Sequence, residues 1–307
     1  MGRIIKDLVQ RFRDENIVGK YIYANVAVYL VFALLGVVVT LFNAVGVAEG
    51  LVSIFRLPSD ITRMLMQPWS IVTYMFLHAG FMHLLWNMLA LYLFGRIFIT
   101  FYSTRHFIGA YILGGIMGGL FFVIAYNIFP FFESQVENSY LVGASAAVLA
   151  VVVASAVRSP NYTVNLVLFG AVRLSTLAIA TVVISLLLVS SDNAGGNFAH
   201  LGGALAGWLF AVMLNKGRDV TTPINAVSGF MLGLWNRLRA WIKERRPGPR
   251  IVKPRQPKSE READYEYNAR KKESNDEIDR ILEKLSQGGY SALTDEEKRR
   301  LYDASHK

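Results

Sequence analysis

Long apolar stretches without charge set the strongest limit on how this chain can fold. They recur between residues 21 and 215, whereas Lys, Arg, Asp and Glu crowd the first twenty residues and the segment after Asn215. A helix needs about 20 apolar residues to cross the hydrocarbon core of a bilayer, which is about 30 Å thick. The sequence therefore predicts an all-α polytopic membrane domain that is followed by a polar tail.

Six segments are predicted to be membrane helices. In chain order they cover residues 21–45, 81–101, 106–129, 143–157, 174–189 and 197–214. The fourth would span only roughly 22 Å at about 1.5 Å per residue, so it would begin below one surface of the bilayer. Residues 161–172 are also apolar, and the fifth helix could instead begin near Tyr162.

The distribution of positive charge predicts the orientation, because cytoplasmic connections retain Lys and Arg. With the basic residues 1–20 inside, the connections expected inside contain Arg105 and Arg158, whereas the outer loops 130–142 and 190–196 contain neither Lys nor Arg. Only the long first loop, which holds two arginines, departs from this pattern, and it is predicted to lie in the membrane interface. We expect a multi-pass protein of the cell membrane with both termini in the cytoplasm.

The segment after the sixth helix is predicted to contact the inner leaflet. Residues 216–246 form a basic juxtamembrane segment, in which residues 230–246 combine apolar and basic side chains. Such an amphipathic helix suits an anionic lipid surface. An ordinary helix that packs against the membrane domain is the alternative.

The last part of the chain is predicted to be a linker and a small domain. Residues 247–272 read as a charged linker, and residues 273–307 as a helical hairpin. Capping-box signatures at residues 274–277 and 294–297 mark the expected starts of its two helices. A hairpin of this size buries little apolar surface, so we expect it to dock on a cytoplasmic partner rather than to catalyse a reaction.

Composition narrows the functional classes. A net charge of +9 would suit a nucleic-acid-binding protein. No basic motif with interleaved stacking aromatics is present, so no nucleic-acid partner is expected. The chain has no cysteine, which excludes disulfides, thiolate catalysis and cysteine-based metal sites. No cofactor is predicted.

Polar side chains inside a bilayer are costly and mark candidate functional sites. Four of them stand out: His83, Asn87, Ser145 and His200. The predicted topology places all four in the first halves of the second, fourth and sixth helices, which run from outside to inside. They should therefore lie at a similar depth near the outer surface.

These side chains suit nucleophilic catalysis. Ser145 needs a general base, and His200 is the only membrane histidine outside the cluster of the second helix, so the two are predicted to form a dyad. Oxyanion donors would come from the first amides of the fourth helix, and His83 and Asn87 could add side-chain donors. No acidic residue is placed to orient His200, since Asp192 lies in a loop eight residues earlier.

Two other interpretations remain open from the residues alone. His78, His83 and His200 could form a three-histidine metal site, although that site would leave Ser145 without a role. Each residue could also be structural, because a serine in a membrane helix usually bonds its own backbone. Regularly spaced glycines can likewise serve only close helix packing.

Three motifs in this order resemble the rhomboid intramembrane serine proteases of bacterial type. Residues 76–88 are similar to the family's second-helix signature of His, four residues, His, three residues and Asn. Residues 143–145 resemble the start of its Gly-x-Ser-Gly nucleophile motif, and residues 196–207 resemble the motif around the sixth-helix histidine. The resemblance covers residues 21–215 and implies a six-helix core.

The resemblance implies roles for individual residues. Ser145 would attack the substrate carbonyl and His200 would act as general base and then as acid. The Ser145 amide, His83 and Asn87 would hold the oxyanion. The positions implied to support this site are His78, Gly143 and Asn197.

The resemblance also implies a substrate class. Family members cleave transmembrane segments of other membrane proteins near the outer face, and the second and fifth helices would form the lateral gate. Ala146 stands where the family has a second glycine. An inactive rhomboid-like protein that binds membrane helices without cutting them is the alternative function.

Overall fold

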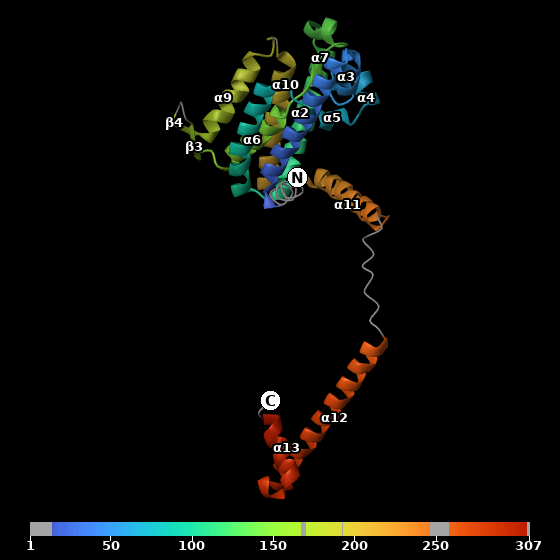
Figure 1. Ribbon diagram of the computed structural model, residues 1–307. Helices are drawn as coiled ribbons and strands as arrows, with labels where there is room; N and C mark the ends of the chain where they lie inside the picture. The colour runs from blue at the N-terminus through green and yellow to red at the C-terminus, as the bar shows by residue number, and fades with distance from the viewer. Residues whose placement is uncertain (1–13, 167–169, 192, 246–257, 306–307) are drawn as a thin grey trace. The chain divides into compact units, whose positions relative to one another are not determined.

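A computed structural model describes residues 14–166, 170–191, 193–245 and 258–305. It divides the chain into two compact units, Met1–Arg237 and Leu238–Lys307. Apolar helices make up most of the first unit and are drawn as one bundle in Figure 1. Six of them are α2 (Ile17–Leu41), α6 (Phe81–Phe101), α7 (Thr104–Ile128), α8 (Ser145–Arg158), α9 (Leu174–Leu187) and α10 (Ala194–Asn215).

These six helices correspond to the six predicted segments. Among the described residues, α2, α6, α7 and α10 are long and apolar enough to cross a membrane, whereas α8 and α9 are shorter apolar helices. The predicted all-α polytopic membrane fold is confirmed. That all six helices cross the membrane completely remains a prediction.

Local chemistry shifts the ends of two helices from their predicted positions. The first helix begins at Ile17 rather than at residue 21, because the side chain of Asn16 accepts a hydrogen bond from the Gly19 N–H at 3.0 Å and caps it. It ends at Leu41, since Asn43 has a φ of 53°. The fourth helix begins at Ser145 rather than at Gly143, whose φ of 124° is incompatible with a helix.

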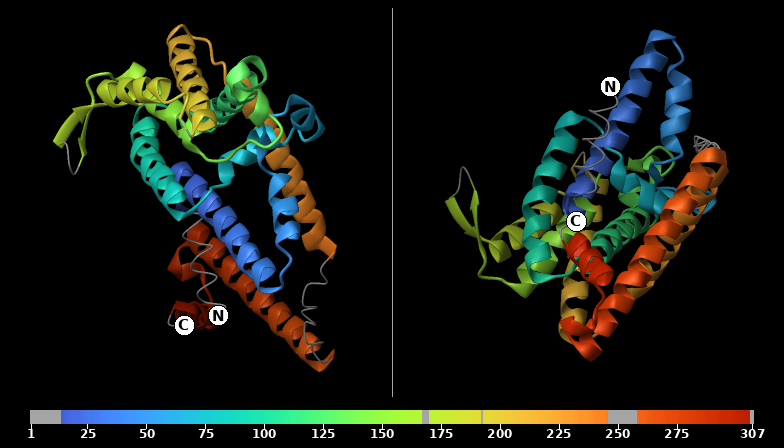
Figure 2. Two further views of the ribbon diagram at one scale, coloured as in Figure 1. Left: turned by 90° about the horizontal axis from the view of Figure 1, so that it is seen from above. Right: turned by 60° about the horizontal axis from the view of Figure 1, so that its bottom comes forward.

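A β-hairpin precedes α9. Strands β3 (Thr163–Leu166) and β4 (Gly170–Arg173) pair in antiparallel register, with Thr163 opposite Arg173. Figure 2 shows this hairpin projecting from one side of the bundle, next to α9. The start of the fifth helix at residue 174 is confirmed, and the alternative start near Tyr162 is wrong because those residues pair as strands.

Short elements fill the connections on either side of α6 and α7. The long first connection contains α3 (Val45–Ser53), β1 (Leu57–Pro58), α4 (Ile61–Met66), α5 (Ser70–Thr73) and η1 (Tyr74–Phe76), and the connection after α7 contains η2 (Pro130–Gln135) and β2 (Tyr140–Leu141). Strands β1 and β2 pair in antiparallel register. The Gly143 N–H then donates to the Tyr74 carbonyl at 3.0 Å. These bonds fix the chain that leads into α6 beside the chain that leads into α8.

Helix α8 lies at the centre of the bundle and contacts α6, α7, α9 and α10. Its neighbours approach closely through glycine. A Cβ built on Gly203 of α10 would lie 2.2 Å from the carbonyl oxygen of Ala146, and one built on Gly207 would lie 2.2 Å from that of Ala150. The spaced glycines therefore allow direct backbone contact between α8 and α10.

The polar tail contains α11 (Thr222–Arg245), α12 (Lys258–Gly288), η3 (Tyr290–Ala292) and α13 (Asp295–Ser305). Residues 246–257, which belong to the predicted linker, lie outside the described residues. Residues 258–272 do not continue that linker, because they are helical. The predicted helix start at residues 274–277 is wrong for the same reason: residues 258–287 contain neither Pro nor Gly, so strong helix formers extend α12 towards the N-terminus.

The second unit has the expected helical hairpin. Helix α12 ends at Gly288, and Gly289 has a φ of 68°, which favours glycine. Ile281 of α12 and Leu293, which lies between η3 and α13, are both buried, whereas Leu282 stays exposed. The small apolar core of the hairpin therefore depends on few side chains.

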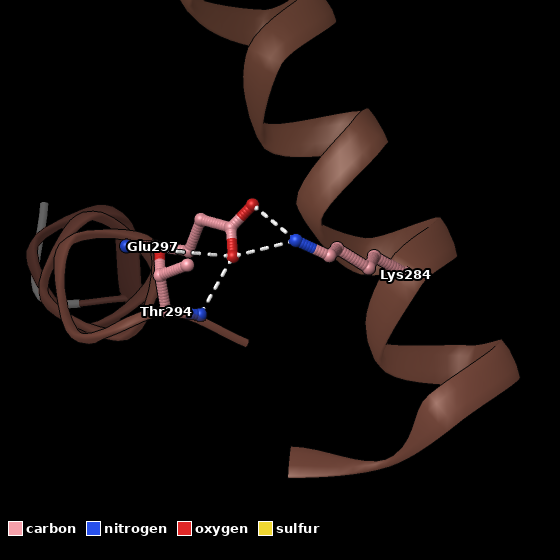
Figure 3. Close-up of polar contacts among 3 residues, drawn as sticks. All are labelled: Lys284, Thr294 and Glu297. Atoms are coloured by element: carbon pink, nitrogen blue, oxygen red, sulfur yellow. Dashed lines mark hydrogen bonds and ion pairs between the residues drawn. The ribbon is translucent and has the colours of Figure 1, made fainter. Parts of the chain in front are cut away.

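The capping box at residues 294–297 forms as predicted (Figure 3). The Glu297 carboxylate accepts from the Thr294 N–H at 2.7 Å, and the Thr294 hydroxyl accepts from the Glu297 N–H at 3.3 Å. The same carboxylate accepts from Lys284 Nζ of α12 at 3.0 and 3.1 Å. One side chain thus both starts α13 and ties it to α12.

Glu297→Ala is expected to lower the protection of α13 amides against hydrogen exchange several-fold in the full-length protein. The Thr294 N–H and then Lys284 hold the pKa of Glu297 below its ordinary value. The stabilisation should therefore be complete above the ordinary pKa of Glu and be lost as the pH falls through the lowered pKa. Exposed Glu296, which pairs only at 3.4 Å with Arg300, supplies the control Glu296→Ala. Equal protection factors in the two variants would contradict this prediction.

Candidate functional site

A cavity of about 1020 Å³ opens in the first unit. It is lined by His83 and Asn87 of α6, Ser145 of α8 and His200 of α10. These are the four polar residues that the sequence placed at a similar depth. The fold therefore brings side chains from three separate segments to one cavity.

Ser145 is the first residue of α8. The first amides of a helix have no carbonyl partner within that helix, and the helix dipole makes this end partly positive. Within α8, the first N–H to bond back along the chain is that of Val148, which donates to the Ala144 carbonyl at 2.9 Å. The amides beside Ser145 are thus suited to stabilise negative charge on a substrate oxygen.

His83 lies directly against Gly143. A Cβ built on Gly143 would lie 2.7 Å from His83 Cε1 and 2.9 Å from Nε2. Glycine is needed here for two independent reasons, its φ of 124° and the close approach of the imidazole. This contact places the His83 ring against Gly143, which lies two positions before Ser145 in the chain.

Asn87 is nearly buried one turn after His83. Its Nδ2 donates to the His83 carbonyl at 2.9 Å, which fixes the amide against its own helix. A primary amide has two N–H donors, so the second remains for another acceptor at the cavity wall.

His200 is held by a residue that the sequence did not single out. Its Nδ1 lies 3.1 Å from the hydroxyl oxygen of Ser185 in α9. Ser185 is 2% exposed and stands in an apolar helix. Such a buried polar group was the available signal, the same one that drew attention to Ser145. In the described part of the chain no hydrogen bond joins Ser145 to His200, and catalytic bonds often tighten only when substrate binds.

The three supporting positions have different surroundings. Gly143 receives His83, as described above. His78 lies outside the main cavity and lines a second one of about 580 Å³, with its ring centroid 5.2 Å from that of His83. The Nδ2 of Asn197 donates to the Leu188 carbonyl at 2.7 Å, which ties the start of α10 to the end of α9.

The geometry bears on the metal candidate but does not test the acidic one. Asp192 lies outside the described residues. Among the residues that the structure describes, no group of three His, Cys, Asp or Glu side chains is arranged to hold a metal ion. His78 in particular lines a different cavity from His200.

Ala146, which follows the serine, points away from this cavity. A Cβ built on Gly118 of α7 would lie 2.5 Å from the Ala146 methyl. The methyl group therefore occupies space that Gly118 leaves open, and Ala146 does not line the cavity. The substitution relative to the Gly-x-Ser-Gly motif is accommodated by packing between α7 and α8.

Fold and cavity together define a polytopic helical membrane protein with a serine and a histidine at a shared internal site. Residues 65–217 match the family model of the Rhomboid domain, and the chain belongs to the rhomboid family. Members of this family are usually serine intramembrane proteases that act on membrane proteins within the bilayer. Residues 261–307 match a family of unknown function (DUF6576). No curated protein sequence matches the chain.

Proposed function

We propose that this protein is an intramembrane serine endopeptidase that uses Ser145 and His200 as a catalytic dyad. The observation that carries the proposal is the single cavity lined by Ser145, His200, His83 and Asn87. A purely structural role would account for each residue alone. It gives no reason for four costly polar groups from three helices to meet at one cavity.

In this proposal each group has one chemical task. Ser145 Oγ attacks the substrate carbonyl while His200 takes the hydroxyl proton, and His200 then returns that proton to the leaving amine. The Ser145 amide, Asn87 and His83 donate to the oxyanion. Water from the polar cavity then hydrolyses the acyl-enzyme and regenerates the serine.

The substrate would be a transmembrane helix that enters from the side. Beyond the polar cluster, the cavity continues along Leu89 and Leu93 of α6 and along Leu177 and Thr181 of α9. These walls are mostly apolar, as a segment leaving lipid requires. We therefore assign α6 and α9 as the two sides of the gate and the cleavage site to the outer part of the bilayer.

We also propose that both termini are cytoplasmic and that α11 rests on the anionic inner leaflet of the cell membrane. Phe230 and Leu234 of α11 are exposed, and Arg237 is three residues further along the same helix. Exposed apolar side chains next to positive charge suit a lipid interface. The hairpin of α12 and α13 exposes Tyr290 and Tyr302 and would bind a cytoplasmic partner.

The test is labelling of the purified protein in detergent by a fluorophosphonate, a probe that reacts with an activated serine. We expect one adduct on Ser145, located by mass spectrometry of the labelled peptide. Ser155 of the same helix is an internal control, because its hydroxyl donates to the Val151 carbonyl at 2.8 Å and should stay unlabelled. A folded protein without an adduct on Ser145 would contradict the proposal and favour a protein that binds membrane helices without cleaving them.

A further inference from the structure

Helix α9 presents one narrow face to the rest of the bundle. Its buried residues are Leu174, Ala178 and Ser185, which share that face by helical spacing. The helix contacts both α8 and α10, the helices that carry the serine and the histidine of the proposed dyad. A polar group buried on this face needs a hydrogen-bond partner, because lipid offers none.

The partner of Ser185 is unusual for a serine in an apolar helix. Ser155 and Thr181 donate to carbonyls of their own helices, four residues back, at 2.8 and 2.9 Å. Ser185 instead has its hydroxyl oxygen 3.1 Å from His200 Nδ1, across the interface to α10. The contact thus joins the gate helix to the proposed general base.

This contact decides which ring nitrogen of His200 is left for catalysis. A neutral imidazole carries one proton, and a general base must receive the serine proton on the nitrogen that lacks it. With Nδ1 beside Ser185, only Nε2 remains for Ser145. Nε2 can act as the base only if the imidazole proton sits on Nδ1.

We propose that Ser185 is the positioning residue of the dyad: its Oγ accepts the hydrogen bond from His200 Nδ1–H and so fixes the tautomer with unprotonated Nε2. The inference rests on the proposed function, in which His200 is the base. In this arrangement the Ser185 hydroxyl is the acceptor across the helix interface, whereas the Ser155 hydroxyl is a donor to its own helix. It would fill the place that a carboxylate takes in a serine-protease triad.

Among the described residues that line the cavity, no acidic side chain competes with Ser185 for His200 Nδ1. No described Asp or Glu lines the cavity, and Asp192 lies outside the described residues. A neutral hydroxyl also avoids placing an uncompensated negative charge within the bilayer. Ser185 can therefore orient the imidazole without the cost of a buried carboxylate.

The kinetic test compares Ser185→Ala with Ser185→Thr and with Ser175→Ala in the full-length protein. The probe is the fluorophosphonate, and its labelling of Ser145 is followed at increasing concentration. We expect Ser185→Ala to lower the maximal labelling rate roughly tenfold, the size set by one neutral hydrogen bond, with little change in the half-saturating concentration. Ser185→Thr keeps the hydroxyl and should restore most of the rate. Ser175, whose hydroxyl donates to the Pro160 carbonyl at 2.9 Å, is the matched control on the same helix.

The second readout does not depend on activity. ¹⁵N spectra of histidine-labelled protein report the tautomer of each imidazole. The chain has five histidines, and the signals of His200 are identified as those missing from the spectrum of His200→Ala. We expect Nδ1–H at His200 in the wild type and a mixture of tautomers in Ser185→Ala. Nε2–H in the wild type, or an unchanged maximal rate in Ser185→Ala, would overturn the proposal.

The two readouts separate this inference from the proposed function. If wild-type Ser145 does not react with the probe at all, the protease proposal fails, and the spectrum still decides whether Ser185 fixes the tautomer. If wild-type Ser145 reacts but Ser185→Ala labels at the wild-type rate, only the role of Ser185 is refuted.

Discussion

His200→Ala is expected to leave a folded protein whose Ser145 no longer reacts with a fluorophosphonate. Without a base to accept its proton, a serine hydroxyl is a weak nucleophile, and removing the histidine of a serine protease lowers kcat on the order of 10⁶-fold. Labelling should therefore fall below detection, as it should in Ser145→Ala. Circular dichroism and gel filtration in detergent would check the fold of each variant.

The matched control for His200→Ala is another histidine of the same domain. His106 near the start of α7 lies 3.7 Å from Asp219 and lines neither cavity. His106→Ala should keep the wild-type labelling of Ser145. Persistent labelling of Ser145 in His200→Ala would show that another group activates the serine and would remove His200 from the dyad.

Gly203→Ala is expected to destabilise the protein by about 2 kcal/mol or more and to slow labelling of Ser145 strongly. The added Cβ would meet the Ala146 carbonyl oxygen at 2.2 Å and its carbonyl carbon at 2.8 Å, and backbone cannot rotate away as a side chain can. Helix α10 must then move away from α8. A displacement of about 1 Å between catalytic groups can cost roughly 100-fold in rate.

Thermal unfolding in detergent and the labelling rate would measure both effects. Gly36→Ala makes the same change in α2, where a built Cβ meets nothing within 4 Å. It should leave both values near those of the wild type or raise stability slightly, because alanine favours the helix. A Gly203→Ala protein with wild-type stability would show that α8 and α10 are packed less closely than this structure has them.

The elements of the fold differ in how far the sequence could predict them. The six apolar helices follow from hydropathy alone, because apolar length in a bilayer leaves the backbone few alternatives to a helix. The capping box of Thr294 and Glu297 was also readable, since its partners lie three residues apart. By contrast, the start of α12 at Lys258 was missed, because a second capping signature at residues 274–277 suggested a later boundary.

The candidate site shows the same division. Ser145, His200, His83 and Asn87 could be selected from the sequence because polar groups in a bilayer are costly, and charge placement put them at one depth. The sequence could not show that His78 lines a separate cavity from His200. Nor could it show that the Ala146 methyl packs against Gly118.

The sequence by itself determined the membrane class, the helical segments and the four polar candidates, because each depends on residues near one another in the chain or on hydropathy. Only the tertiary structure decided which polar groups meet. Ser155 and Ser185 look alike in the sequence, because each is a serine with apolar neighbours within an apolar helix. One bonds its own helix and the other bonds His200, because only the packing of α9 against α10 sets which partner lies within reach.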